Sequence, residues 1–317
     1  MIHSYSNFKL NMMNQGQPKL CVFIHYSKYL YIPKYVVIYV NEISKYFDQV
    51  ILVTNHRDIR PDLSDLNKNI TTRFVKNEGY DLGMFYKVFQ TVDSTKYSQI
   101  ACINDSNILF NELLPIFNWS NANPADVWGL LDSNEKPWFS THQDNYHIQS
   151  HFIAFNQRAI EKLPAFFKSI QIERLFMEND QAKLRRTVIN DWEIGLTQFM
   201  ISQGLSTGCY IDSSIYSQIY LSGRPGNIGH KLYPELIHSG YPLIKKRIIT
   251  HGKWTQNFLP ARSWKKMIRI YGNRDWEIDR LIQELIQIKN DSGYRPYHRL
   301  KKKILVVYHS LLNKDVA

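Results

Sequence analysis

Three polar residues, Asn104-Asp105-Ser106, interrupt an apolar stretch that runs from Gln99 to Phe110. A carboxylate at the end of a buried strand can hold Mg²⁺ or Mn²⁺, and that cation can in turn hold a diphosphate. The neighbouring amide and hydroxyl oxygens could orient the carboxylate or bind a ribose. The same triplet also fits an Asx-type turn, in which Asp105 accepts hydrogen bonds from nearby backbone N–H groups. Taken alone, the triplet leaves the metal site and the turn both open.

A second polar segment, Asn77-Glu78-Gly79-Tyr80-Asp81, joins a predicted strand to a predicted helix. Gly79 permits a positive φ, and the N-terminus of the following helix offers free N–H groups to phosphate or ribose oxygens. An ordinary βα loop, with Asp81 capping the helix, is the alternative. The segment is not a GxGxxG motif and no P-loop lysine follows it, which disfavours dinucleotide and ATP binding.

Glu193 is the candidate general base. We expect it in the first turn of a helix that Asp191 caps and that ends at Gly204. There it could deprotonate an acceptor hydroxyl, or it could simply complement the helix dipole. The preceding Trp192 could stack on a sugar or pack in the core.

The segment HIQSHF (147–152) is predicted to be a strand with His147, Gln149 and His151 on one face. These side chains could hydrogen-bond sugar hydroxyls, or they could form a half-exposed polar face. Because the two histidines would lie ~13 Å apart along a strand, we do not expect them to share a zinc ion.

The elements that must position these residues alternate between apolar strands and amphipathic helices. Strands are predicted at 20–27, 49–56, 70–77 and 99–106, with helices at 31–47 and 81–92. This order favours a doubly wound parallel sheet, in which ligands bind beyond the carboxyl ends of the strands. The polar clusters expected at that edge are His25-Tyr26-Ser27, Thr54-Asn55-His56, Asn77–Asp81 and Asn104-Asp105-Ser106.

Composition excludes several classes of protein. No run approaches the ~18 apolar residues of a membrane-spanning helix. Cys21, Cys102 and Cys209 form no CxxC pair, which favours buried thiols in a reducing compartment. The net charge of +11 lies entirely beyond residue 241, where 17 Lys/Arg face 6 Asp/Glu, and the first 241 residues are balanced at 22 each. Such a distribution suits docking on an anionic membrane better than nucleic-acid binding.

Five segments of the chain also resemble a known family when they are taken together. They occur in order and at loop-sized spacing: NEGYDLGMFYKVF, INDSNILF, DVWGLLDS, HIQSHFIAF and DWEIGLTQFMISQG. Over roughly residues 20–250 the chain resembles the rhamnan synthesis protein F family of bacterial glycosyltransferases. That resemblance implies a GT-A-like α/β fold, with a mostly parallel Rossmann-type sheet and flanking helices. It also implies an inverting transfer of a sugar, often rhamnose, from a nucleotide donor to a cell-surface polysaccharide or lipid-linked acceptor.

The resemblance also implies roles for individual residues. Asn104-Asp105-Ser106 stands where GT-A enzymes keep their Asp-x-Asp, and Glu193 matches the base of inverting enzymes. With a single carboxylate in the triplet, dependence on Mg²⁺ or Mn²⁺ through Asp105 stays open, and His230 or Lys231 could hold the diphosphate instead. Tyr80 stands where the family often has Arg. Taken together with the residues at the strand ends, the expected donor contacts are His25, Tyr26, Asn55, Asn77, Asp81, Asn104, Asp105 and Ser106. The expected sugar or acceptor contacts are His147, Gln149 and Trp192, of which the resemblance itself implies Gln149.

We expect a loose leader at 1–18, a catalytic domain at 19–244 and a basic helical extension at 245–317. The extension's end, 294–312, places basic residues before apolar ones. It is expected either to dock on the inner face of the cytoplasmic membrane or to form a solvated terminal helix. The competing functions are a non-catalytic nucleotide-sugar-binding module and a nucleic-acid-binding protein. The latter is disfavoured by the neutral first 241 residues.

Overall fold

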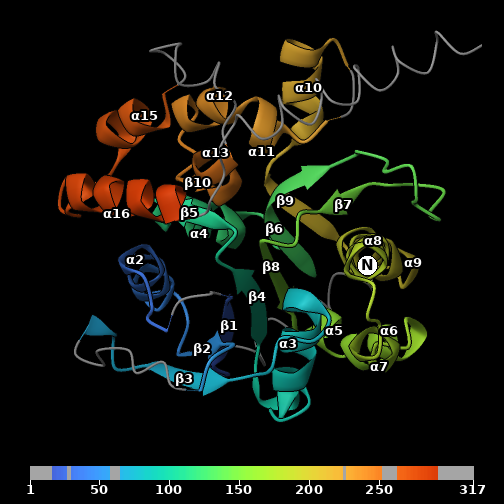
Figure 1. Ribbon diagram of the computed structural model, residues 1–317. Helices are drawn as coiled ribbons and strands as arrows, with labels where there is room; N and C mark the ends of the chain where they lie inside the picture. Colours follow the sequence, from blue (N-terminus) through green and yellow to red (C-terminus); the bar gives the residue numbers. More distant parts are fainter. Residues whose placement is uncertain (1–15, 27–29, 58–64, 224–225, 252–262, 292–317) are drawn as a thin grey trace, which may run out of the picture.

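The fold is a mixed α/β architecture in which helices flank one central sheet (Figure 1). The computed structural model describes residues 16–26, 30–57, 65–223, 226–251 and 263–291. The strands of the central sheet are β1 (Lys19–His25), β2 (Gln49–Thr54), β3 (Ile70–Phe74), β4 (Gln99–Asn104), β6 (Val127–Ser133), β7 (His147–Ile148), β8 (Phe152–Asn156) and β9 (Thr207–Ile211). Two further strands, β5 (Asn107–Leu109) and β10 (Leu243–Lys245), form a small antiparallel sheet.

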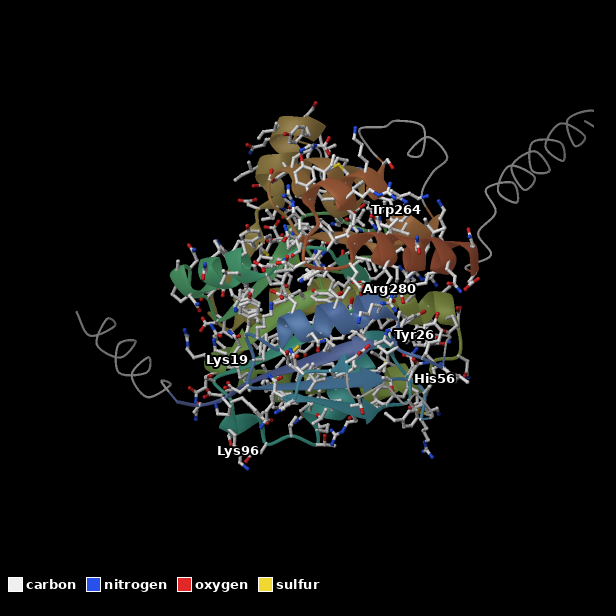
Figure 2. All side chains as sticks on the ribbon, turned by 90° about the vertical axis from the view of Figure 1, so that its left-hand side faces the viewer. Lys19, Tyr26, His56, Lys96, Trp264 and Arg280 are labelled. Atoms are coloured by element: carbon white, nitrogen blue, oxygen red, sulfur yellow. The ribbon has the colours of Figure 1, made fainter. Side chains whose placement is uncertain are left out.

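The central sheet is parallel over most of its first half. Its strand order is β3-β2-β1-β4-β8-β6-β7, and β9 pairs with β6. The pairs β3-β2, β2-β1, β1-β4 and β6-β9 are parallel, whereas β8 is antiparallel to both of its neighbours. The predicted fold class, a mostly parallel α/β sheet with flanking helices, is confirmed. As expected for parallel strands, Tyr26 and His56 lie at one edge of the sheet, and Lys19 and Lys96 lie at the opposite edge (Figure 2).

Helices cover both faces of the sheet (Figure 1). The helices up to β9 are α2 (Lys34–Ile43), α3 (Tyr80–Phe89), η2 (Ser94–Lys96), α4 (Leu114–Ala122), α5 (Gln157–Ile160), α6 (Leu163–Ser169), α7 (Glu173–Phe176), α8 (Gln181–Val188), the π-helical η3 (Ile189–Ile194) and α9 (Gly195–Ser202). After β9 follow α10 (Ser213–Leu221), α11 (Ile228–Lys231), α12 (Tyr233–His238), α13 (Lys246–His251), α15 (Trp264–Tyr271) and α16 (Ile278–Asp291).

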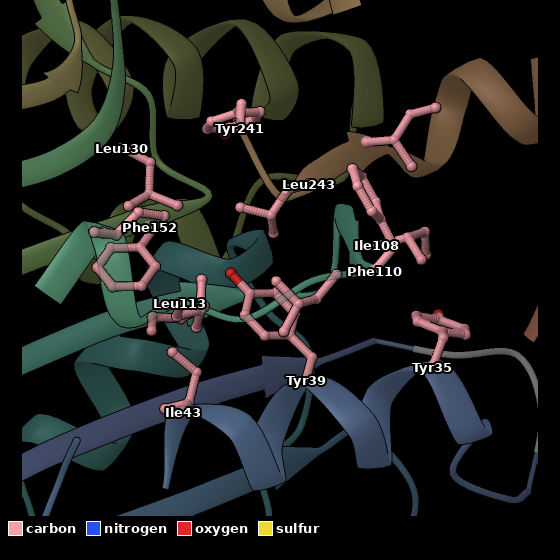
Figure 3. Close-up of a cluster of buried hydrophobic side chains, with 14 of the residues drawn as sticks. Tyr35, Tyr39, Ile43, Ile108, Phe110, Leu113, Leu130, Phe152, Tyr241 and Leu243 are labelled. Carbon is pink, nitrogen blue, oxygen red and sulfur yellow. The ribbon is translucent and has the colours of Figure 1, made fainter. Parts of the chain in front are cut away.

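Two hydrophobic clusters flank the sheet. Strands β1 and β4 are almost continuously apolar because their side chains enter both clusters, one on each face. On the α2 side, Tyr39 and Ile43 point from the helix toward Leu113 and its apolar neighbours (Figure 3). Burying each such side chain contributes ~1.5–3 kcal/mol. This packing fixes α2 against β1 and against β5, the strand that follows the polar end of β4.

The described part of the expected 245–317 extension packs into the same core. The boundary at 244/245 falls inside β10, and Ile248, Trp264, Ile282 and Leu285 belong to the cluster that contains α2. Because β10 pairs with β5, the basic run that follows it lies next to the turn after β4. The membrane-docking segment expected at 294–312 lies outside the described residues.

The helix around Glu193 begins earlier than predicted. Asp180 caps α8 by accepting hydrogen bonds from the backbone N–H groups of Ala182 at 2.8 Å and Lys183 at 3.1 Å. The helical path then continues through η3 into α9, so the prediction that Asp191 caps a helix is wrong. The predicted end is confirmed, since Gly204 follows the helix with φ +72°. Glu193 therefore lies inside a π-helical segment, a local geometry that often marks functional sites.

The predicted single strand at 147–152 is also wrong. Strand β7 ends at Ile148 and β8 begins at Phe152, with residues 149–151 forming a turn between them. Both strands pair with β6, so the turn is an insertion into an otherwise continuous antiparallel pairing. A regular strand would alternate its side chains between two faces, and the turn removes that restriction.

Candidate active site

A cavity of about 530 Å³ lies among the turn after β4, the β7–β8 turn, η3, α11 and β10. It is polar, and it contains both acidic and basic side chains. Its lining comprises Ser106, Ser133, Glu135, Pro137, Phe139, His147, Gln149, Ser150, His151, Arg185, Ile189, Glu193, Ile194, Asn227, His230, Lys245 and Arg247. All three residues of the β7–β8 turn line it, which the predicted regular strand would not have allowed.

Glu193 is the carboxylate that η3 presents to this cavity. Its Oε1 accepts a hydrogen bond of 2.8 Å from Ser150 Oγ in the β7–β8 turn. The bond fixes one carboxylate oxygen across two elements that are 43 residues apart. A partly exposed carboxylate held in this way can accept a proton from a hydroxyl group in the cavity.

Asp81 and Asn104 lie behind Ser150. Asn104 Nδ2 donates to Asp81 Oδ2 at 2.6 Å and to the backbone oxygen of Ser150 at 3.4 Å. Burial, together with the negative charge of Glu193, raises the pKa of Asp81 to about 6. Asp81 does not cap α3, which begins after Gly79 without a side-chain cap. Instead it supports Asn104 and the turn that carries Ser150.

Asp105 lies in a closed corner beside the cavity. One oxygen, Oδ2, meets Lys246 Nζ at 2.7 Å, His25 Nδ1 at 2.8 Å and Tyr35 Oη at 2.9 Å. Burial alone would raise the pKa of the Asp105 carboxyl, but Lys246 and His25 together hold it well below its usual value. The carboxylate is therefore charged and already paired with a cation.

The residues around Asp105 do not fit a divalent metal. Mg²⁺ and Mn²⁺ need several oxygen ligands, whereas Asp105 Oδ2 is already contacted by the Lys246 ammonium at 2.7 Å, and a second cation beside it would be repelled. Within the described ranges, no three His, Cys, Asp or Glu side chains are grouped closely enough to hold a metal. We therefore assign no step to a metal at Asp105.

Lys245, next to Lys246, extends toward the cavity. Its Nζ donates to Gln149 Oε1 at 2.8 Å and to Asn227 Oδ1 at 3.1 Å. Part of the side chain is exposed to the cavity, yet the surrounding protein desolvates the ammonium enough to lower its pKa to about 8. The nearby His230 has its pKa lowered to about 4, first by burial and then by the positive charges of Lys245 and Arg247.

The structure brings only some of the predicted residues to the cavity. Ser106, His147, Gln149 and Glu193 line it. Asp81 and Asn104 lie directly behind its wall, whereas Tyr26, Asn55 and Asn77 follow the ends of β1, β2 and β3 and do not line it.

Two predicted contacts are wrong because the side chains are fully buried. His25 is 0% exposed and supports Asp105, so it cannot touch a ligand in the cavity. Trp192 is also 0% exposed and packs against Phe85 and Phe166, so its indole offers no face to a sugar.

Sequence reasoning missed most of the basic residues of the site. Lys245, Arg247 and Arg185 all line the cavity. The sequence placed the first two in the C-terminal extension and led to no prediction for Arg185. Of the two alternatives His230 and Lys231, only His230 lines the cavity. A usable signal was the run Lys245-Lys246-Arg247 directly after an apolar segment.

An aromatic pair at the cavity rim was also missed. Trp138 is 84% exposed, its ring lies edge-on to that of Phe139 with centroids 5.6 Å apart, and Phe139 lines the cavity. In the sequence, two adjacent aromatic residues within a polar loop were the feature that could have indicated this pair.

Comparisons with known proteins give a family for the chain. The family model described as rhamnan synthesis protein F matches residues 50–315. Virulence protein VirA of Vibrio anguillarum is 24% identical over 231 residues, which cover 63% of this chain and 68% of VirA.

Solved structures match only loosely. A 4-diphosphocytidyl-2C-methyl-D-erythritol synthase from Anaerococcus prevotii is 15% identical with a TM-score of 0.37, covering 55% of this chain and 83% of its own. A putative glucose-1-phosphate thymidylyltransferase from Bacillus anthracis is 10% identical with a TM-score of 0.37, covering 61% and 87%. At these values neither structure bears on the chemistry of the site. The family match, in contrast, spans most of the chain, which therefore belongs to the rhamnan synthesis protein F family.

Proposed function

We propose that this protein is a glycosyltransferase that moves a sugar from a nucleoside-diphosphate donor to a hydroxyl group of a cell-surface glycan or lipid-linked acceptor. The observation that carries the proposal is that Glu193 shares one cavity with Lys245 and Arg247. A base and a cationic group are the two parts that such a transfer needs. The volume of about 530 Å³ suits a small organic ligand. Membership of a rhamnan synthesis family supports rhamnose as the donated sugar.

The reaction that this geometry supports is a single displacement. Glu193 takes the proton of the acceptor hydroxyl while the hydroxyl oxygen attacks the anomeric carbon. The bond between that carbon and the diphosphate oxygen breaks, and its electron pair leaves with the diphosphate. Attack from the face opposite the leaving group inverts the configuration. Ser150 keeps Glu193 oriented throughout through its 2.8 Å hydrogen bond.

The acceptor is proposed to approach over Trp138. An exposed indole beside the cavity can stack on a sugar ring, a role that the buried Trp192 cannot fill. Arg186 lies over the Trp138 ring at 5.7 Å and helps to hold the indole in place. Polar contacts to the sugar hydroxyls are proposed for His147 and Gln149, both of which line the cavity.

Action at the inner face of the cytoplasmic membrane is proposed because a lipid-linked acceptor would be found there. Within the residues that the structure describes, no helix has the length and hydropathy needed to span a bilayer. The basic residues beyond Pro242 would favour an anionic leaflet.

A transfer assay tests the proposal. The purified protein is incubated with a panel of nucleotide sugars, including thymidine-diphospho-rhamnose, and with bacterial glycolipid acceptors, and the products are identified by mass spectrometry. Glu193→Gln should lower transfer about 100- to 10,000-fold and leave donor affinity unchanged, as expected on losing a general base. Glu161→Gln, at an exposed glutamate of α5's C-terminal end, is the matched control.

Two results would contradict this function. One is near-full transfer by Glu193→Gln. The other is donor binding without turnover on any acceptor of the panel, which would favour a non-catalytic nucleotide-sugar-binding module.

A further inference from the structure

We propose that Lys245 and Arg247 bind the donor diphosphate directly and take the place of a divalent metal, and that Asp105 positions them through Lys246. This inference rests on the proposed function, because it concerns the donor of that reaction. Asp105, the carboxylate at the end of β4, then has a structural role in place of metal binding.

The ammonium group of Lys245 has a donor left for a ligand. It has three N–H donors, and two of them meet the neutral amide oxygens of Gln149 and Asn227. Across the described part of the chain, Lys245 forms no salt bridge. The carboxylates of Glu193 and Glu135 line the same cavity and favour the charged form of Lys245, but neither forms an ion pair with it. Desolvating a cation that has no paired anion costs free energy, and a directly bound anionic ligand would offset that cost. The diphosphate of the donor is such an anion.

Two further cationic side chains share the cavity with Lys245. Arg247 and Arg185 line the same cavity, and within the described residues neither of them forms a salt bridge. A guanidinium group matches phosphate oxygens with two parallel N–H donors, whereas an ammonium acts as a point charge. Together these side chains supply the positive charge that a bound Mg²⁺ or Mn²⁺ would otherwise supply as the diphosphate leaves.

Asp105 positions the segment that carries Lys245 and Arg247. Lys245 pairs with Asn107 in the small sheet, and the backbone N–H of Lys246 donates to the oxygen of Ser106 at 2.8 Å. The side chain of Lys246 then enters the corner and contacts Asp105 at 2.7 Å and Tyr35 at 3.0 Å. With Lys246 held there, its neighbours on both sides extend into the cavity. Asp105 is thus a positioning residue.

Isothermal titration calorimetry with thymidine diphosphate tests this inference on the full chain. Affinity should be the same in EDTA and in MnCl₂. Lys245→Met and Arg247→Gln should each weaken binding about tenfold or more in EDTA, the scale of a lost charged hydrogen bond. Lys168→Met, at an exposed lysine of α6, should bind like the unmodified protein.

Asp105→Asn separates positioning from metal binding. It should weaken thymidine diphosphate binding in EDTA, where no metal is available, and MnCl₂ should not restore the affinity. A role in folding alone would lower the melting temperature and leave the affinity of the folded fraction unchanged.

Other outcomes would overturn the inference. Binding or transfer that appears only with MnCl₂ would contradict it and leave the proposed function standing. Unchanged affinity of folded Lys245→Met and Arg247→Gln would do the same. If Lys245→Met does not fold, Arg247→Gln decides, because Arg247 is exposed. Absence of binding by thymidine, uridine and guanosine diphosphates in both conditions would overturn the inference and the proposed function together.

Discussion

The two sides of the turn after β4 use charge in opposite ways. On the α2 side, Asp105 Oδ2 is surrounded by Lys246, His25 and Tyr35, and the charges compensate one another inside the protein. On the cavity side, the hydrogen-bond partners of Lys245 among the described residues are the amide oxygens of Gln149 and Asn227, and no carboxylate forms an ion pair with it there. Both sides belong to one short stretch of backbone, since Lys245 and Lys246 are adjacent. The paired charge of Lys246 holds the segment in place, and the charge of Lys245, which has no ion pair there, is available to a ligand.

This contrast also separates two carboxylates, Asp105 and Asp81, whose pKa values are shifted in opposite directions. The pKa of Asp105 is lowered by its cationic partners against the effect of burial, whereas burial and Glu193 raise the pKa of Asp81 to about 6. Asp105 is therefore charged at neutral pH, and its charge is balanced by Lys246. Such a carboxylate suits a permanent structural ion pair.

Breaking the closed corner should give the largest effect. Asp105→Ala leaves Lys246 without its carboxylate and should lower the free energy of unfolding by about 3–5 kcal/mol. Lys246→Met leaves Asp105 without its ammonium partner and should also destabilise the fold. The double variant should lose less than the sum of the two, by about 0.5–3 kcal/mol. Urea denaturation of the four proteins measures this coupling, and strict additivity would show that the pair is not an energetic unit.

The same pair predicts a dependence on acid. The folded pKa of Asp105 is below its unfolded value, which is about 3.9. Its contribution to stability is therefore fully present above that unfolded value and is lost as the pH falls toward the folded one. Asp105→Ala should remove this part of the acid dependence.

The open cavity should respond to pH on the alkaline side. Lys245 has a pKa of about 8, so it is charged at pH 7 and loses its proton above pH 8. Affinity for thymidine diphosphate should fall about tenfold between roughly pH 7 and 9.5, equivalent to one charged contact. Lys245→Met should be weaker at pH 7 and flat over the same range. An equally steep decline in the variant would assign the titration to another group.

The smallest effect is expected at the rim. Trp138→Ala should raise KM for the glycan acceptor about two- to tenfold, the scale of one aromatic contact. Donor affinity should not change, because Trp138 lies outside the cavity lining. Steady-state kinetics with each substrate varied in turn measure the difference, and Met177→Ala at an 82% exposed methionine is the control. A loss of donor affinity instead would place Trp138 in the donor site.

Local sequence patterns predicted the sheet and its polar edge because apolar runs and helical spacing are visible over short windows. Strand β4, which ends at Asn104, and the end of the helix before Gly204 were predicted in this way. Glu193 was found as a candidate base although its helix was predicted to start about ten residues too late. A π-helical segment has no short sequence signature, so its presence could not be anticipated.

Pairing across the chain could not be predicted. Lys246 and Asp105 are 141 residues apart, and only the fold brings them together through β5 and β10. The burial of His25 and Trp192 has the same cause, since the side chains that cover them come from distant segments. Residue type and spacing indicated chemistry at the strand ends, but they did not indicate which charges would be neutralised inside the protein.

A crystal structure of the protein with thymidine diphosphate and MnCl₂ tests the central claim most directly. We predict that the diphosphate contacts Lys245 and Arg247 inside the cavity, with Lys246 still on Asp105 and no Mn²⁺ between them. Mn²⁺ bound to the Asp105 carboxylate, with Lys246 displaced and the diphosphate on the metal, would contradict the account.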